Sequence, residues 1–213
     1  GPDDRQPMPL APFIALLAKE LAFGVTIAMF LVIVFETFAA FGALVDTSRM
    51  AAMATVLDPL QRRQSTVMSG FFLNVAVVLF LLVGGHRLLL TAMAESYRIA
   101  PVDRILPEQF IGQRTVEPML RLAADLFVVA FRMAAPVIAI MLLLDVALGL
   151  INRAAPQIQV FFLGFTVKPW LGVLFLLFAL GVVLELAQQH FASIFQLMTD
   201  WLETVKPEPA PPQ

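Results

Sequence analysis

The sequence predicts an all-α membrane protein from its composition, its hydropathy and the way its apolar residues are grouped. Of 213 residues, 60% are hydrophobic and 14% are charged, whereas soluble proteins contain about 45–50% apolar and about 25% charged residues. The mean hydropathy is +0.85, and the apolar residues fall into four long blocks. A soluble domain of this size cannot bury so much apolar surface, so lipid or an apolar partner must cover part of it.

Charge and composition exclude several classes of function. The formal net charge is −2, and nucleic-acid binding needs clustered lysine and arginine, so no nucleic-acid partner is expected. Cysteine is absent and the only histidines, His86 and His190, lie far apart. Thiolate chemistry is therefore excluded and a histidine metal site is not expected. No cofactor, metal site or catalytic residue is predicted.

The four apolar blocks cover residues 12–45, 66–90, 116–151 and 169–205. Each is as long as the ~20 residues that cross a bilayer, and each is interrupted by charge, glycine or proline. Gly84-Gly85 predicts a kink or a helix end, and Pro136 predicts a kink. We expect one helical domain over 11–205, with a C-terminal hairpin at about 140–205 and an exposed linker at about 98–114. Residues 1–10 are expected to form a polar loop, and the proline-rich tail 206–213 is expected to be disordered.

Ionisable residues inside the apolar blocks need a physical explanation. Each would cost at least ~2.5–3.5 kcal/mol at the centre of a bilayer, so each must pair, face water or lie outside lipid. Glu117, Arg121 and Asp125 are spaced four apart, which permits pairing on one helix face. An alternative is that the helices pack against other subunits instead of crossing the bilayer conventionally. The other charges concerned are Glu20, Glu36, Arg132 and Asp145.

The joint between the first two blocks, residues 46–65, is small, rich in methionine and bounded by charge. Methionine is flexible, so such a segment can pack against irregular surfaces and release again, which suits a movable plug. The residues alone favour the alternative, a tight loop in which Arg62 and Arg63 only orient the neighbouring helices, because methionine and alanine are common in any membrane protein. The candidate plug residues are Met50, Ala51, Ala52, Met53, Ala54 and Thr55, and the candidate anchors are Asp46, Arg49, Asp58, Arg62 and Arg63.

The joint before the last block, residues 149–169, contains a proline and several polar residues. Pro156 is expected to end or kink the preceding helix, and Arg153 and Gln157 offer donors to the carbonyls freed there. The residues alone favour equally a capped helix turn and a subunit-binding segment.

At these joints the sequence resembles the FliR/SctT family of flagellar and virulence type III secretion systems. Residues 153–168 are similar to the signature R-x-A-P-Q-x-x-x-F-x-x-G-F-x-x-K of that family, and Leu57-Asp58-Pro59 follows its order and spacing. The motif Asp46-x-x-Arg49 is closer to the injectisome branch, to which we lean, and Gly164-Phe165 to the flagellar one. Members usually carry about two further apolar segments before Gly1, so N-terminal segments are expected to be missing. The motif residues are Arg153, Pro156, Gln157, Phe161, Gly164 and Lys168.

The resemblance implies a core subunit of an export gate in the bacterial inner membrane, within the basal body of the secretion system. Long kinked helices and hairpins would pack in a helical hetero-oligomer with FliP/SctR-like and FliQ/SctS-like subunits. Further partners would be a switch protein similar to FlhB/SctU and the unfolded export substrates. Residues 46–64 would correspond to the plug loop of the family, and the motif residues of the second joint would lie at subunit interfaces.

The residues bear on two other classes of function. An ion-coupled secondary transporter is the main alternative, since Glu36, Asp125, Asp145 and the Pro136 kink resemble features of coupling sites. No inverted repeat supports it. A membrane enzyme is disfavoured because the sequence contains no HExxH motif, no GxSxG motif and no pairing of a nucleophile with a base.

Overall fold

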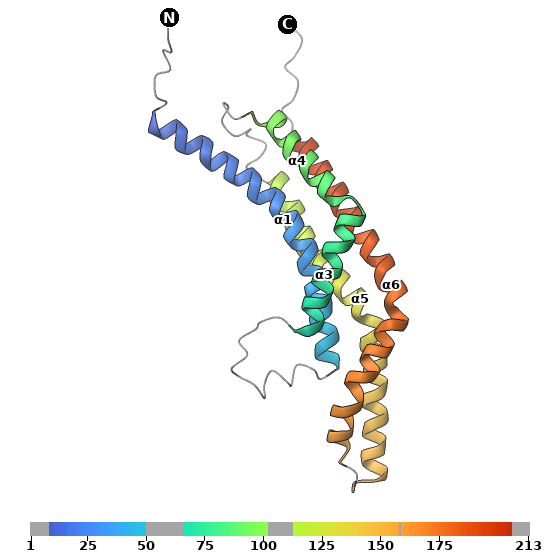
Figure 1. The fold of residues 1–213 in the computed structure, drawn as a ribbon. Coiled ribbons are helices and arrows are strands. Elements are labelled where there is room, and N and C mark those ends of the chain that lie inside the picture. Colours follow the sequence, from blue (N-terminus) through green and yellow to red (C-terminus); the bar gives the residue numbers. More distant parts are fainter. Residues whose placement is uncertain (1–8, 50–65, 102–112, 158, 206–213) are drawn as a thin grey trace, which may run out of the picture.

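The computed structural model of the chain is all-helical, as the sequence predicts. It describes residues 9–49, 66–101, 113–157 and 159–205, the side chains of Gln113 and Arg114 excepted. Five helices follow one another along the described chain and form a long, curved bundle (Figure 1). They are α1 (Leu10–Ser48), α3 (Val67–Leu82), α4 (Gly85–Ile99), α5 (Gln113–Ala154) and α6 (Val160–Val205).

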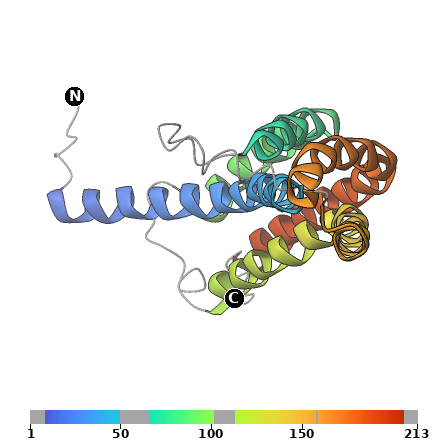
Figure 2. The same cartoon turned by 90° about the horizontal axis from the view of Figure 1, so that it is seen from below.

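Helix α1 accommodates polar residues inside a long apolar run. The hydroxyls of Thr26 and Thr37 donate to the carbonyl oxygens four residues earlier, those of Ala22 and Ile33, each at 2.8 Å. A threonine hydroxyl satisfied in this way adds little polarity to an apolar surface. The first turns of α1, residues 10–18, are mostly exposed and project away from the other helices (Figures 1 and 2).

The glycine pair predicted as a kink or a helix end separates α3 from α4. Gly84 has φ +81°, a conformation that glycine adopts without steric cost, and the two helices meet at a bend of 69°. Gly85 is also required sterically, because a Cβ there would overlap the ring of Phe80. At the other end of α3, Thr66 acts as N-cap and accepts a hydrogen bond from the Ser69 N–H at 3.4 Å.

Helices α5 and α6 form an antiparallel hairpin around a short turn that contains Pro156. Our expectation that Pro156 ends or kinks the preceding helix is met, since α5 ends at Ala154. The last helix, however, begins at Val160 and not at Pro169. Residues 160–168 are mostly apolar and continue the helix, and Pro169 removes only one backbone donor from its interior. The tip of the hairpin extends beyond the other helices (Figure 1).

Aromatic side chains form much of the core, which lies where α1 meets α3, α5 and α6. Trp201 packs against Phe23 and Phe30, with ring centroids 6.0 and 5.9 Å apart. Phe41 and Phe72 join α1 to α3 at 4.4 Å. Tilted and edge-on ring pairs stabilise beyond their buried area, so the middle of α1 is the centre of the fold.

Three helices among the described residues, α1, α5 and α6, are long and apolar enough to cross a membrane, and α3 with α4 makes a fourth if the bent pair counts as one span. The three helices have 39, 42 and 46 residues, or ~58 to ~69 Å at about 1.5 Å per residue. This is about twice the ~30 Å of a hydrocarbon core, so a large part of each helix lies outside it or is strongly tilted.

Gly42 brings α1 against the backbone of α3, and this contact leads to a stability prediction. A Cβ at residue 42 would lie 2.5 Å from backbone atoms of Met68 and Ser69, whereas a Cβ at Gly24, in the same helix, would meet nothing within 4 Å. We expect Gly42→Ala to lower the free energy of unfolding by about 1–3 kcal/mol. Gly24→Ala should raise it by up to about 1 kcal/mol, the usual preference for alanine in a helix.

Denaturation of the two variants in detergent measures both changes. Equal effects at the two glycines would contradict the close approach of α1 and α3.

Candidate functional site

The end of α1 contains a buried ion pair made of two of the candidate anchors. Arg49 Nη2 lies 3.4 Å from Asp46 Oδ1, and both side chains are almost fully buried. Asp46 Oδ2 also accepts a 2.8 Å hydrogen bond from the Met68 N–H in the first turn of α3, where a carboxylate complements the helix dipole. Asp46 therefore ties the end of α1 to the start of α3.

The remaining plug and anchor residues follow directly on Arg49. They fall at 50–63, outside the residues that the structure describes. Asp46, Thr47 and Ser48 themselves form the last residues of α1. The segment predicted as the plug therefore starts from a helix end that is held in place.

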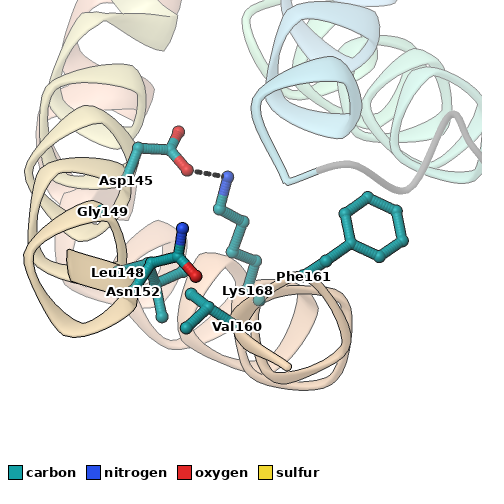
Figure 3. Close-up of a pocket in the computed structure, with 8 residues that line it drawn as sticks. Asp145, Leu148, Gly149, Asn152, Val160, Phe161 and Lys168 are labelled. Atoms are coloured by element: carbon teal, nitrogen blue, oxygen red, sulfur yellow. Dashed lines mark ion pairs between the residues drawn. The ribbon is translucent and has the colours of Figure 1, made fainter. Parts of the chain in front are cut away.

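A second ion pair joins the two helices of the C-terminal hairpin. The Lys168 ammonium on α6 pairs with the Asp145 carboxylate on α5 (Figure 3). The Lys168 side chain is only 6% exposed, whereas that of Asp145 is 48% exposed. The pair lies at one end of a cavity of about 330 Å³, towards which the Asn152 side chain also points. The carboxylate compensates a cation that would otherwise be buried alone.

The other motif residues surround the tip of the same hairpin. Arg153 lies in the last turn of α5, Pro156 and Gln157 form the turn, and all three are exposed. Phe161 is 61% exposed at the start of α6. Gly164 is buried, and a Cβ there would lie 3.2 Å from the Leu148 side chain, so it allows α5 and α6 to approach. Gly164 and Lys168 thus shape the hairpin, while the tip residues are available for contact.

A buried lysine connects α1 to the end of α4. Lys19 Nζ donates to the carbonyl oxygens of Ala100 at 3.2 Å and Pro101 at 2.7 Å, and it pairs with the Glu20 carboxylate at 2.8 Å. The carbonyls at a helix C-terminus have no partner within the helix and carry partial negative charge. Lys19 satisfies these groups at the C-terminal end of α4.

Two further polar contacts hold α6 against its neighbours. His190 Nε2 lies 3.1 Å from Thr37 Oγ1; because the threonine hydroxyl donates to the Ile33 carbonyl, its oxygen accepts and Nε2 carries the proton. Trp201 Nε1 donates to Thr115 Oγ1 at 3.3 Å. Within the described part of the chain, no three histidine, aspartate or glutamate side chains could together hold a metal ion.

Comparison with known proteins decides the family. The profile of "Bacterial export proteins, family 1" matches residues 2–194, which is nearly the whole chain. The chain belongs to this family. The resemblance found at the two joints is thereby confirmed.

Relatives from flagellar and secretion systems are similar to this export protein to the same degree. It is 28% identical to the flagellar biosynthetic protein FliR of Pectobacterium carotovorum over 189 residues, which cover 88% of this chain and 70% of the relative. It is also 28% identical to the surface presentation of antigens protein SpaR of Salmonella typhimurium, over 85% of this chain and 67% of the relative. The secretion system apparatus protein SsaT of the same organism is 28% identical to this chain over 195 residues, which cover 91% of this chain and 73% of the relative.

Family membership establishes the general function. This bacterial export protein is an inner-membrane component of a type III secretion export apparatus and acts with other subunits of that apparatus. It is a transport component, as predicted, and not an enzyme. The secondary transporter is not supported.

Sequence reasoning did not identify two of these contacts. Asp145 and Lys168 lie eleven and twelve residues on either side of Pro156, so folding a hairpin at this proline would have paired them. The contact of Lys19 with carbonyl groups more than 80 residues away had no comparable signal in the sequence.

Proposed function

We propose that this export protein is the T-type subunit of the export gate and that residues 46–64 are the plug that closes its conduit at rest. The observation that carries the proposal is the burial of Asp46 and Arg49 at the end of α1, immediately before the methionine- and alanine-rich segment. A closing segment needs at least one fixed end, and the hydrogen bond that Asp46 accepts from the Met68 N–H of α3 supplies it.

We further propose that the partners are FliP/SctR-like and FliQ/SctS-like subunits, a switch protein similar to FlhB/SctU, and unfolded export substrates. Helices of ~58 to ~69 Å, with many large apolar side chains exposed, suit packing against other apolar helices beyond the bilayer. The exposed tip residues Arg153, Pro156, Gln157 and Phe161 are the proposed subunit contacts. Several copies of two smaller hydrophobic proteins per chain, in a native mass spectrum of the purified complex, would support this assignment.

Deleting Ala51 to Thr55 is expected to make the assembled gate leaky to small ions, because the shortened segment no longer fills the conduit. The measurement is ion conductance of the complex in planar bilayers. A deletion of equal length in the tail, Glu208 to Pro212, serves as control and should leave conductance at the wild-type value. An unchanged conductance after the first deletion would remove the plug assignment.

A further inference from the structure

Arg49 lies directly on the backbone of α6, at Gly172. A Cβ at residue 172 would overlap Cγ and Cδ of Arg49, so the arginine occupies the space that any other side chain would take. Gly172 is buried in α6, one helical turn after Lys168. Glycine is required here because of this close approach and not for its backbone conformation.

The polar groups of Arg49 are poorly satisfied in this position. Among the residues that the structure describes, its guanidinium forms one ion pair, from Nη2 to Asp46 at 3.4 Å, and Asp46 also accepts a hydrogen bond from the N–H of Met68. In the part of the chain that the structure describes, Nε and Nη1 are buried without a hydrogen-bond partner. Buried donors without acceptors destabilise the state that contains them. Arg49 is therefore held at α6 mainly by the packing of its Cγ and Cδ on Gly172.

We propose that the contact between Arg49 and Gly172 is a releasable latch. While the gate is closed, Arg49 packs on Gly172, its seat, and holds the end of α1 against α6. When the gate opens, Arg49 leaves this position. Release frees Nε and Nη1 to meet acceptors, which offsets the packing that is lost. Gly172 is a positioning residue, because it acts through Arg49. The inference rests on the proposed gating function and names the contact that controls it.

Helix α6 contains a matched control for this glycine. A Cβ at Gly181 would meet nothing within 4 Å, so Gly181→Ala adds a methyl group to the same helix without touching Arg49. Gly172→Ala and Gly172→Val add side chains of increasing volume at the position that Arg49 occupies. Any effect of helix propensity is shared by the two alanine variants.

The experiment measures closed-state conductance of the full complex in planar bilayers, with complex yield as the measure of assembly. We expect Gly172→Val to raise the open fraction about tenfold, the change that a shift of ~1.4 kcal/mol in a two-state equilibrium produces. Gly172→Ala should have a smaller effect in the same direction, and Gly181→Ala none. Conductance unchanged in both Gly172 variants at normal yield would overturn the latch.

A double-mutant cycle tests whether Gly172 acts through Arg49. Arg49→Ala alone should raise conductance, and adding Gly172→Val to it should have no further effect, because no arginine remains to be displaced. Additive effects would overturn the latch. If Gly172→Val alone fails to assemble, recovery of assembly in the double variant supports the seat, and failure of both overturns it.

The two experiments distinguish an error in the latch proposal from an error in the plug proposal. If deletion of Ala51 to Thr55 opens the gate but the Gly172 and Arg49 variants do not, the latch is wrong and the plug stands. If the deletion has no effect, the plug assignment is wrong whatever the Gly172 variants show.

Discussion

Asp145→Asn is expected to destabilise the hairpin more than Lys168→Met, although the two substitutions break the same ion pair. Removing the carboxylate leaves the Lys168 ammonium, 94% buried, without its anion, and an uncompensated buried charge costs about 3–5 kcal/mol. Removing the ammonium leaves a carboxylate that is 48% exposed and can still be hydrated. We expect that loss to be about 1.5–3 kcal/mol, the range for a hydrogen bond to a charged group.

Denaturation of the purified complex in detergent measures both losses as free energies of unfolding. The double variant Asp145→Leu/Lys168→Met should recover most of the stability, because it buries no unpaired charge. The exposed pair of Glu117 and Arg121, 2.5 Å apart, provides the control: Glu117→Gln should change stability by about 0–1 kcal/mol. Equal losses for the two single variants would mean that the Lys168 ammonium reaches water.

Lys19→Met is expected to release the end of α4 from α1, with a loss of about 3 kcal/mol. The buried carbonyl oxygen of Ala100 and the partly buried one of Pro101 lose their donor, and a buried acceptor left unsatisfied costs about 1–3 kcal/mol. Glu20→Gln is the milder control, because the lysine then keeps both carbonyls.

Hydrogen exchange of the amides in the last turn of α4 localises this effect. The Ala100 N–H, which donates to the Ser96 carbonyl, should exchange faster in Lys19→Met than in Glu20→Gln. Equal protection in the two variants would contradict a stabilising role of Lys19 at this helix end.

Local signals in the sequence were sufficient for the fold class and for several contacts. Apolar blocks longer than 20 residues predicted the long helices, and Gly84-Gly85 predicted the break at the 69° bend. The four-residue spacing of Glu117, Arg121 and Asp125 permitted pairing, and the structure contains the pair of Glu117 with Arg121. In each case the residues that determine the structural feature lie within or next to it in the sequence, so the feature can be predicted from a local pattern.

Contacts between distant helices could not be predicted in the same way. The pattern of a helix indicates which residues share a face, but not which other helix that face meets. Gly172 has no sequence feature that connects it to Arg49, more than 120 residues earlier, and Lys19 would have been expected to reach water. The family signature included Lys168 but not its partner Asp145, which only a hairpin folded at Pro156 brings into contact with it.

The bend at Gly84 sets the chain apart from an ordinary bundle of spans. Helices α3 and α4 contain 16 and 15 residues, or ~24 and ~22 Å, and each alone is shorter than a hydrocarbon core of ~30 Å. Their neighbours α1, α5 and α6 are about twice that thickness. As straight spans, the five helices therefore match no single bilayer thickness: α3 and α4 each fall short of the hydrocarbon core, while α1, α5 and α6 exceed it unless they tilt or extend beyond it. Packing among protein subunits removes this conflict, because the apolar surface of a partner has no fixed thickness.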